Sequence, residues 1–247
     1  MAACLWPPRG PDWVVVGQRE SRCLERTPGA SLLGVLTPTL QEQFGQIDIY
    51  LFDQLLKGRI SPGMRILDAG CGSGRNLVYF LREGYDGLCR ADPQAVEGVR
   101  ALARKFAPAL PASNFRVEAV EHMSFDEACA EVVVSNTVLH FARDDAHFET
   151  MLRGTWRVLK PGGLFFCRLA STIVMEDQFK RVQGRRFLSP DGAERYLVDA
   201  ALLGSLAERI GGELAEPLKT TVVQLTRDDH VGSAEETVVK PADSSPC

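Results

Sequence analysis

The chain has 247 residues, 45% of them hydrophobic and 24% charged, which is enough for one substantial core. A formal net charge of −4 gives no electrostatic footprint for nucleic acid. No apolar run approaches the roughly 20 residues that cross a bilayer. We therefore expect a cytoplasmic protein with no nucleic-acid partner and no membrane segment.

Residues 1–40 contain several Pro and Gly pairs and no sustained hydrophobic period, so we predict an irregular or disordered extension. Residues 44–56 form one amphipathic helical stretch. Its aromatic residues Phe44 and Tyr50 either pack this helix onto the domain or touch a ligand, and the sequence leaves both interpretations open.

A glycine-rich turn follows the strand expected at 64–69. Gly70, Gly72 and Gly74 alternate with other residues, and a helical run begins at Leu77. Glycine tolerates positive φ and has no Cβ, so a ligand can lie close to the backbone while N–H groups of the next helix point toward it. The sequence therefore predicts a nucleotide-binding turn.

Strand and helix signals then alternate, with strands expected at 88–91, 115–119 and 132–135. Such alternation predicts an α/β fold, a doubly wound, mostly parallel sheet with helices on both faces. A helix through Leu152 and Trp156 is expected to end at Pro161, and the next two glycines turn the chain into a further strand. Ligands bind such sheets at the carboxyl ends of the strands.

We predict a domain over residues 41–227 and a polar tail over 228–247. Within the tail, residues 236–239 are expected to form a short last strand beside 220–223. The seven cysteines show no C-x-x-C pair, which argues against zinc and against a disulfide framework. We expect no bound metal, and we expect Cys71 in the glycine turn to be a small packing residue.

Three motifs occur in an order that resembles the class I S-adenosylmethionine-dependent methyltransferases. They are the glycine turn after Asp68, the segment Glu131–Phe141, and the Lys-Pro-Gly-Gly turn at 160–163. Gly74-Arg75-Asn76 with the later Gly84-Tyr85-Asp86 resembles the small-molecule, tellurite-resistance-like branch. The resemblance implies a Rossmann-like methyltransferase fold with a seven-stranded sheet, S-adenosyl-L-methionine as cofactor and a small-molecule acceptor.

The same resemblance implies a set of site residues. Cofactor contacts are expected from Asp68, Gly70, Cys71, Gly72, Gly74, Asn76, Asp92, Glu121 and Asn136. Asp68 would accept from the cofactor ammonium, directly or through water. Asp92 is either the ribose carboxylate or the cap of the helix that starts at Pro93, and both readings stay open. Glu121 is the carboxylate expected near the adenine.

His140 is the candidate catalytic residue, a base for an acceptor with an acidic or protonated group. The alternative is a buried or capping histidine. Arg168 and Tyr196 either orient an acceptor or are an exposed arginine and a core-edge tyrosine.

The expected function is methyl transfer. The alternative is a methyltransferase-like binding or interaction protein with weak or no turnover. It is suggested by a displaced acid: the family usually has a ribose-binding Asp or Glu at the end of the second strand, where this chain has Arg90 or Ala91, and Asp92 is the nearest carboxylate. The sequence specifies neither the acceptor nor the oligomeric state.

Overall fold

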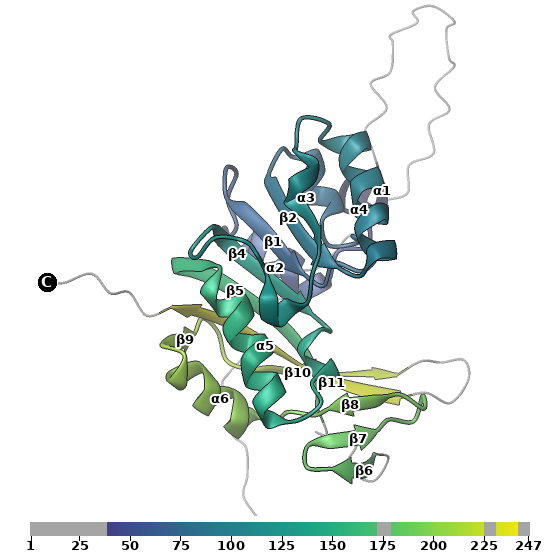
Figure 1. Cartoon of the computed structure of the whole chain (residues 1–247), viewed down its shortest axis with the longest axis vertical. Helices are drawn as coiled ribbons and strands as arrows, with labels where there is room; N and C mark the ends of the chain where they lie inside the picture. The colour runs from purple at the N-terminus through teal and green to yellow at the C-terminus, as the bar shows by residue number, and fades with distance from the viewer. Residues whose placement is uncertain (1–38, 172–178, 225–230, 242–247) are drawn as a thin grey trace, which may run out of the picture. The chain divides into compact units, whose positions relative to one another are not determined.

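The computed structural model describes residues 39–171, 179–224 and 231–241. They build a central sheet covered by helices and a small second sheet (Figure 1). The central sheet has the strand order β10-β11-β5-β4-β1-β2-β3, with β9 beside β11. Its five parallel strands are β1 (Arg65–Ala69), β2 (Asp86–Ala91), β3 (Phe115–Val117), β4 (Ala130–Asn136) and β5 (Leu159–Ala170).

Three further strands are antiparallel to their neighbours: β9 (Gly212–Leu214), β10 (Lys219–Gln224) and β11 (Val231–Pro241). The α/β class is therefore as expected, but the prediction of a mostly parallel seven-stranded sheet was wrong in its count. The last strand expected at 236–239 lies inside β11, which pairs with both β5 and β10. The extension expected at 1–40 lies, up to residue 38, outside the described residues.

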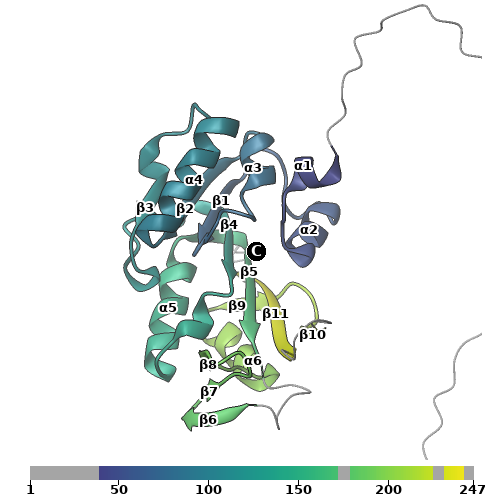
Figure 2. The same cartoon turned by 90° about the vertical axis from the view of Figure 1, so that its right-hand side faces the viewer.

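Helices cover both faces of the sheet. They are α1 (Leu40–Phe44), α2 (Ile49–Leu56), α3 (Val78–Arg82), α4 (Pro93–Phe106), α5 (Asp145–Arg157) and α6 (Ala200–Arg209), with 3₁₀ turns η1 (Ala112–Asn114), η2 (Val120–His122) and η3 (Leu139–Phe141). Because strand side chains alternate between faces, Ile66 packs with α2, α3 and α4, whereas Leu67 packs with α5 and α6. Figure 2 shows α2 and α5 on opposite sides of β4 and β5.

A second sheet follows β5 in the chain. Its antiparallel strands are β6 (Lys180–Gln183), β7 (Arg186–Leu188) and β8 (Glu194–Tyr196). The Val198 N–H donates to the Ala170 carbonyl at 3.1 Å, so the chain after β8 returns to the end of β5. This return carries residues of β8 toward the carboxyl ends of the parallel strands.

The single helix expected at 44–56 is divided in two. Gly45 has φ 65°, which ends α1, and Asp48 caps α2 by accepting from the Tyr50 N–H at 3.0 Å. Phe44 packs against Phe52 and Tyr79, with ring centroids 4.8 and 4.9 Å apart, so its contacts are those of the packing alternative. A glycine inside an amphipathic stretch was the available signal for this break.

The helix before Pro161 ends earlier than expected. α5 stops at Arg157 and β5 starts at Leu159, so Pro161 already lies in the strand. The Arg157 and Val158 carbonyls accept from the backbone of residues 128–130, and this pairing with the incoming β4 replaces the last helical turn. Within the described ranges, no helix is long and apolar enough to cross a membrane, and no group of three metal-ligand side chains is present.

Candidate functional site

The three glycines of the turn after β1 have different environments. A Cβ on Gly70 (φ 109°) would lie 2.3 Å from Val138 Cγ2, and one on Gly74 (φ 77°) would lie 2.8 Å from Val99 Cγ2. Packing therefore requires glycine at both positions. A Cβ on Gly72 (φ 49°) would meet nothing within 4 Å. Gly72 is the glycine of the turn that leaves space for a ligand.

This space belongs to a cavity of about 570 Å³. The cavity lies where β1, β2 and β4 end, which is the usual ligand position in a doubly wound sheet, and its volume is in the usual range for small-molecule sites. Its lining residues are Gly70, Gly72, Arg90, Ala91, Asp92, Thr137, Val138, His140, Phe141 and Arg195.

Asp68 lies at the end of β1 and is 1% exposed. Neither carboxylate oxygen has a hydrogen-bond partner among the described residues. Burial raises the pKa of Asp68 to about 7, although the charge of Arg75 acts in the opposite direction. A buried carboxylate with no partner is rare and costly, so the structure beneath the glycine turn lacks a donor that a cationic ligand or a water would supply.

Asp92 follows β2, and its contacts bear on the two interpretations left open for it, helix cap and ribose carboxylate. Its Oδ1 accepts from the Gln94 and Ala95 N–H groups, both at 3.0 Å, so Asp92 caps α4. Asp92 also lines the cavity, and the cap uses only that oxygen. Arg90 is turned to the Glu118 carbonyl, to which its Nε donates at 2.8 Å. The capping alternative is therefore observed, and the ribose role stays a prediction.

Asn76 and Asn136 do not line the cavity; both contact the buried Asp48. The Asp48 N–H donates to Asn76 Oδ1 at 3.0 Å, and Asn136 Nδ2 donates to Asp48 Oδ2 at 2.9 Å. Arg168 Nη1 donates to the same oxygen at 2.6 Å. Burial alone would raise the pKa of Asp48, but the bond from Asn136 and the charge of Arg168 hold it below its usual range.

His140 lies in η3 and lines the cavity while being 7% exposed. Its Nδ1 has no partner among the described residues. Burial and the charge of Arg195 lower the pKa of His140 to about 4, so the ring is neutral near pH 7. Arg195 is itself held by Asp191, to which Nη1 and Nη2 donate at 2.8 and 2.6 Å. The exposed ring of Phe141 forms an apolar part of the wall.

Glu121 and Tyr196 are not among the lining residues of the cavity. The Glu121 carboxylate lies 2.7 Å from His147 Nε2. The Tyr196 hydroxyl donates to Asp145 at 2.9 Å, and its ring stacks on Phe148 in the core. Tyr196 thus has the contacts of a core tyrosine, and the adenine role of Glu121 stays a prediction.

Cys71 is joined to Cys89 by a disulfide, a pairing that the sequence analysis did not expect. The turn bends back beside β2, with Ala69 opposite Arg90 in the parallel register, so two cysteines 18 positions apart become neighbours. Sequence spacing gave no sign of this approach. Both residues are buried, so Cys71 is part of the packing beneath the turn.

Three residues of the site were missed by sequence reasoning: Asp48, Thr137 and Arg195. The pattern of an acid before an amphipathic helix marks Asp48 as a cap, but its burial depends on contacts 28 to 120 positions away. Thr137 was passed over because its unusual φ of 60° is visible only in the structure. Arg195 reaches the cavity through the second sheet.

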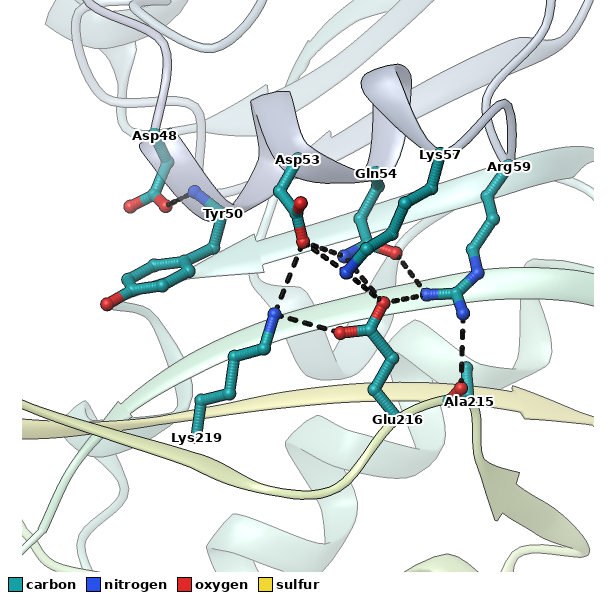
Figure 3. Close-up of polar contacts among 9 residues, drawn as sticks. All are labelled: Asp48, Tyr50, Asp53, Gln54, Lys57, Arg59, Ala215, Glu216 and Lys219. Atoms are coloured by element: carbon teal, nitrogen blue, oxygen red, sulfur yellow. Dashed lines mark hydrogen bonds and ion pairs between the residues drawn. The ribbon is translucent and has the colours of Figure 1, made fainter. Parts of the chain in front are cut away.

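A second group of charges ties α2 to the segment before β10 (Figure 3). Glu216 accepts from Lys57 at 2.6 Å and from Lys219 at 2.8 Å, and it also pairs with Arg59. Asp53 pairs with Lys57 and Lys219. We call these five residues the α2–β10 cluster. The ring of Tyr50 lies beside it, 5.6 Å from the Lys219 ammonium, and Tyr50 is not a lining residue of the cavity.

Residues 67–167 match the family model described as "Methyltransferase domain". An uncharacterized methyltransferase of Synechocystis is 30% identical over 109 residues, 43% of this chain and 47% of that protein. Malonyl-[acyl-carrier protein] O-methyltransferase of Herminiimonas arsenicoxydans is 30% identical over 142 residues, 56% of this chain and 51% of that protein. The chain thus spans about half the length of the curated relatives it matches.

Solved structures share the fold. A methyltransferase of Methanosarcina mazei superimposes with a TM-score of 0.63 at 18% identity, covering 77% of this chain and 98% of that one. The Burkholderia thailandensis 1,6-didemethyltoxoflavin-N1-methyltransferase, solved with S-adenosylhomocysteine, superimposes with a TM-score of 0.57 at 18% identity, covering 81% of this chain and 80% of that one. These findings show a match to a methyltransferase domain over residues 67–167 and a fold shared with solved S-adenosylmethionine-dependent methyltransferases. The prediction of the tellurite-resistance-like branch is not confirmed. TehB of Haemophilus influenzae is a distant structural neighbour at 15% identity, with a TM-score of 0.57 that covers 79% of this chain and 63% of that one.

Proposed function

We propose that the chain is an S-adenosylmethionine-dependent methyltransferase acting on a small-molecule acceptor. The observation that carries the proposal is the unpartnered, buried Asp68 carboxylate beneath a glycine turn whose middle glycine opens into the cavity. A buried carboxylate without a donor fits a ligand with an ammonium group, and S-adenosylmethionine has one. The matched methyltransferase domain and the fold shared with the S-adenosylhomocysteine complex support the same cofactor.

The residues of the turn and of β2 would hold the cofactor. Gly72 allows close approach to the backbone, and Asp92 offers a carboxylate at the end of β2. The bound cofactor would supply a methyl group on a positively charged sulfur. The protein then has to align the acceptor with that methyl and exclude water. Thr137, Phe141 and Arg195 form the part of the cavity wall where we place the acceptor.

His140 is the base that this wall offers. Its ring is neutral near pH 7 and lines the cavity, so it can accept a proton from an acceptor whose acidic O–H or protonated N–H lies within hydrogen-bond reach. The low pKa of His140 makes it a weak base, which suits an acidic hydroxyl better than an aliphatic ammonium. The malonyl and ubiquinone-pathway relatives are named as O-methyltransferases, which supports an oxygen acceptor.

The test is transfer of a labelled methyl group. Wild-type protein, the His140→Gln variant and heat-inactivated protein are incubated with S-[methyl-³H]adenosylmethionine and a deproteinised metabolite extract. We expect label in a small-molecule product with wild type and a large loss with His140→Gln. If the folded wild type binds cofactor but labels no product, the chain is a binding or interaction protein, which is the alternative that the displaced acid at Arg90–Asp92 suggests.

A further inference from the structure

Thr137 follows β4 and has a backbone conformation that is unusual for its side chain. Its φ is 60°, in the left-handed region, where a β-branched residue is a genuine outlier. Its side chain is exposed, and it lines the cavity beside Val138 and His140. Such strain persists only where surrounding contacts over-determine the conformation, and it clusters at functional sites. The conformation of Thr137 therefore depends on the contacts around it.

The hydrogen bonds of Thr137 connect it to the residues on either side of the β4–β5 pairing. The Thr137 N–H donates to the Arg168 carbonyl at 2.9 Å, and its hydroxyl donates to the Asn136 carbonyl at 2.6 Å. Asn136 and Arg168 are also direct partners in the parallel register of the two strands. The conformation of Thr137 thus depends on where Asn136 and Arg168 are held.

Both of these residues are held by one carboxylate. Asp48 Oδ2 accepts from Asn136 Nδ2 at 2.9 Å and from Arg168 Nη1 at 2.6 Å, and the Asp48 side chain is fully buried. Arg75 Nη2 lies 3.7 Å from the same oxygen and donates to Asn136 Oδ1 at 3.3 Å. Charge-assisted bonds of this kind in a buried site are strong and geometrically specific.

Asp48 also reaches the exit of the glycine turn. Its N–H donates to Asn76 Oδ1 at 3.0 Å, while its Oδ1 caps α2. Asp48, in the connection between α1 and α2, therefore holds two parts of the cavity wall. One is the end of β4 with Thr137, and the other is the glycine turn that leads to Asn76. Neither Asp48 nor its partners Asn76, Asn136 and Arg168 are lining residues of the cavity, so Asp48 acts on the wall through its partners.

We propose that Asp48 is a positioning residue, which through Asn136 and Arg168 holds Thr137 in its left-handed conformation in the wall of the cofactor and acceptor cavity. Asn136 and Asn76 then serve the site through Asp48, in place of the direct cofactor contacts predicted for them. This inference rests on the proposed function in one respect: it takes S-adenosylmethionine as the ligand of the cavity.

The test is a double-mutant cycle between Asp48 and Thr137. Asp48→Asn keeps the cap of α2, because asparagine is as good a cap as aspartate, but it removes the charge and turns an N–H toward the donors of Asn136 and Arg168. Thr137→Gly removes the penalty for positive φ, because glycine adopts that region freely. Asp144→Asn is the control, since Asp144 is a cap of α5 that accepts from the His147 N–H at 2.7 Å.

The first readout is affinity for S-adenosylhomocysteine by calorimetry. We expect Asp48→Asn to weaken binding about tenfold or more, through loss of buried charge-assisted bonds. Adding Thr137→Gly to Asp48→Asn should restore part of the affinity, although Thr137→Gly gives no improvement in the wild-type background. A purely structural role of Asp48 would lower stability without this rescue. Wild-type affinity in Asp48→Asn, or a double variant no better than Asp48→Asn, would overturn the proposal.

The second readout, the urea midpoint of unfolding, needs no ligand. Thr137→Gly should raise the midpoint more in wild type than in Asp48→Asn, because the strain exists only while Asp48 holds the segment. Equal shifts would overturn the proposal. If Asp48→Asn does not fold, Asn136→Ala takes the place of that variant in the double-mutant cycle. Asn136→Ala keeps the Asp48–Arg168 pair, so its effects on affinity and on the urea midpoint should be smaller but of the same sign. Failure of wild type to bind S-adenosylhomocysteine would reject the proposed function and leave this second readout to decide the role of Asp48.

Discussion

The α2–β10 cluster and the cavity beside the glycine turn both contain several charged side chains, but the two regions differ in how those charges are paired. In the cluster, Glu216 has three cationic partners and Asp53 has two (Figure 3). Beside the cavity, Asp68 has no hydrogen-bond partner among the described residues, and neither has His140 Nδ1. The paired charges hold α2 to the segment around β10, whereas the unpartnered atoms of Asp68 and His140 are those that the proposed cofactor and acceptor would contact.

The largest expected effect of breaking this contrast is at Asp68. The pKa of Asp68 is about 7 in the folded state and has its ordinary, lower value in the unfolded state. At pH values between these two pKa values the folded state binds more protons, so the stability of the fold falls as pH rises through 7. Asp68→Asn cannot ionise and should be more stable than wild type at pH 8, by up to about 4 kcal/mol. The gain should disappear near pH 4. Urea unfolding from pH 4 to pH 8 measures it, and a variant less stable at pH 8 would contradict the account.

His140 gives the next effect, with the opposite pH dependence. Its folded pKa of about 4 lies below the unfolded value, so the folded state binds fewer protons and stability is lost as pH falls through 6.5 toward 4. His140→Gln should therefore be more stable than wild type at pH 5, by up to about 2 kcal/mol, and equal to it at pH 8. The imidazole resonances of His140 should not shift between pH 8 and pH 6. A midpoint inside that range would show that the ring is not desolvated.

Removing the central acid of the α2–β10 cluster should have a smaller effect. Glu216→Gln removes the charge shared by Lys57, Arg59 and Lys219 and should destabilise the fold by about 1 kcal/mol at pH 7, with less loss at high salt. The pKa of Glu216 is lowered to about 2, so this stability is present above the unfolded pKa and is lost as pH falls toward 2. Glu97→Gln, in an exposed pair with Arg104, is the control and should change little.

The smallest effect on stability is expected at Phe141. Its ring is 63% exposed in the cavity wall, so Phe141→Ala should change the free energy of unfolding by less than about 0.5 kcal/mol. Phe148→Ala, at a ring that is 2% exposed, should cost about 3 kcal/mol or more. Equal losses for the two variants in urea unfolding would show that Phe141 is a core residue.

The parts of the fold that depend on short-range sequence patterns could be predicted from the sequence. The strand before Asp68, the glycine turn and the alternation through β4 follow from hydrophobic period and glycine spacing, both of which are local. The helix end before Pro161 was misplaced, because strand pairing with β4 replaces the last helical turn. The break at Gly45 was not predicted, and there the glycine and the cap at Asp48 decide it.

The candidate site divides in the same way. Asp68 at the end of β1, Gly72 in the turn after it and His140 beyond β4 could be named as candidates from motifs at strand ends. Asp48, Thr137 and the Cys71–Cys89 pair depend on contacts between distant segments or on a backbone angle, and sequence pattern carries neither. Asn76 and Asn136 both contact Asp48, which only folding brings to them, and the cofactor contacts expected of them stay a prediction.

If the space above Gly72 is the cofactor site, as we propose, calorimetric titration with S-adenosylmethionine detects binding that depends on this glycine. The comparison uses wild type, Gly72→Asn and Gly84→Asn, because both glycines have positive φ with nothing within 4 Å of an added Cβ, and Gly84 does not line the cavity. Asparagine tolerates positive φ better than most residues, so backbone strain is matched. We expect saturable binding by wild type and Gly84→Asn and loss of binding in Gly72→Asn. Absence of binding by folded wild type, or equal binding by all three, would contradict it.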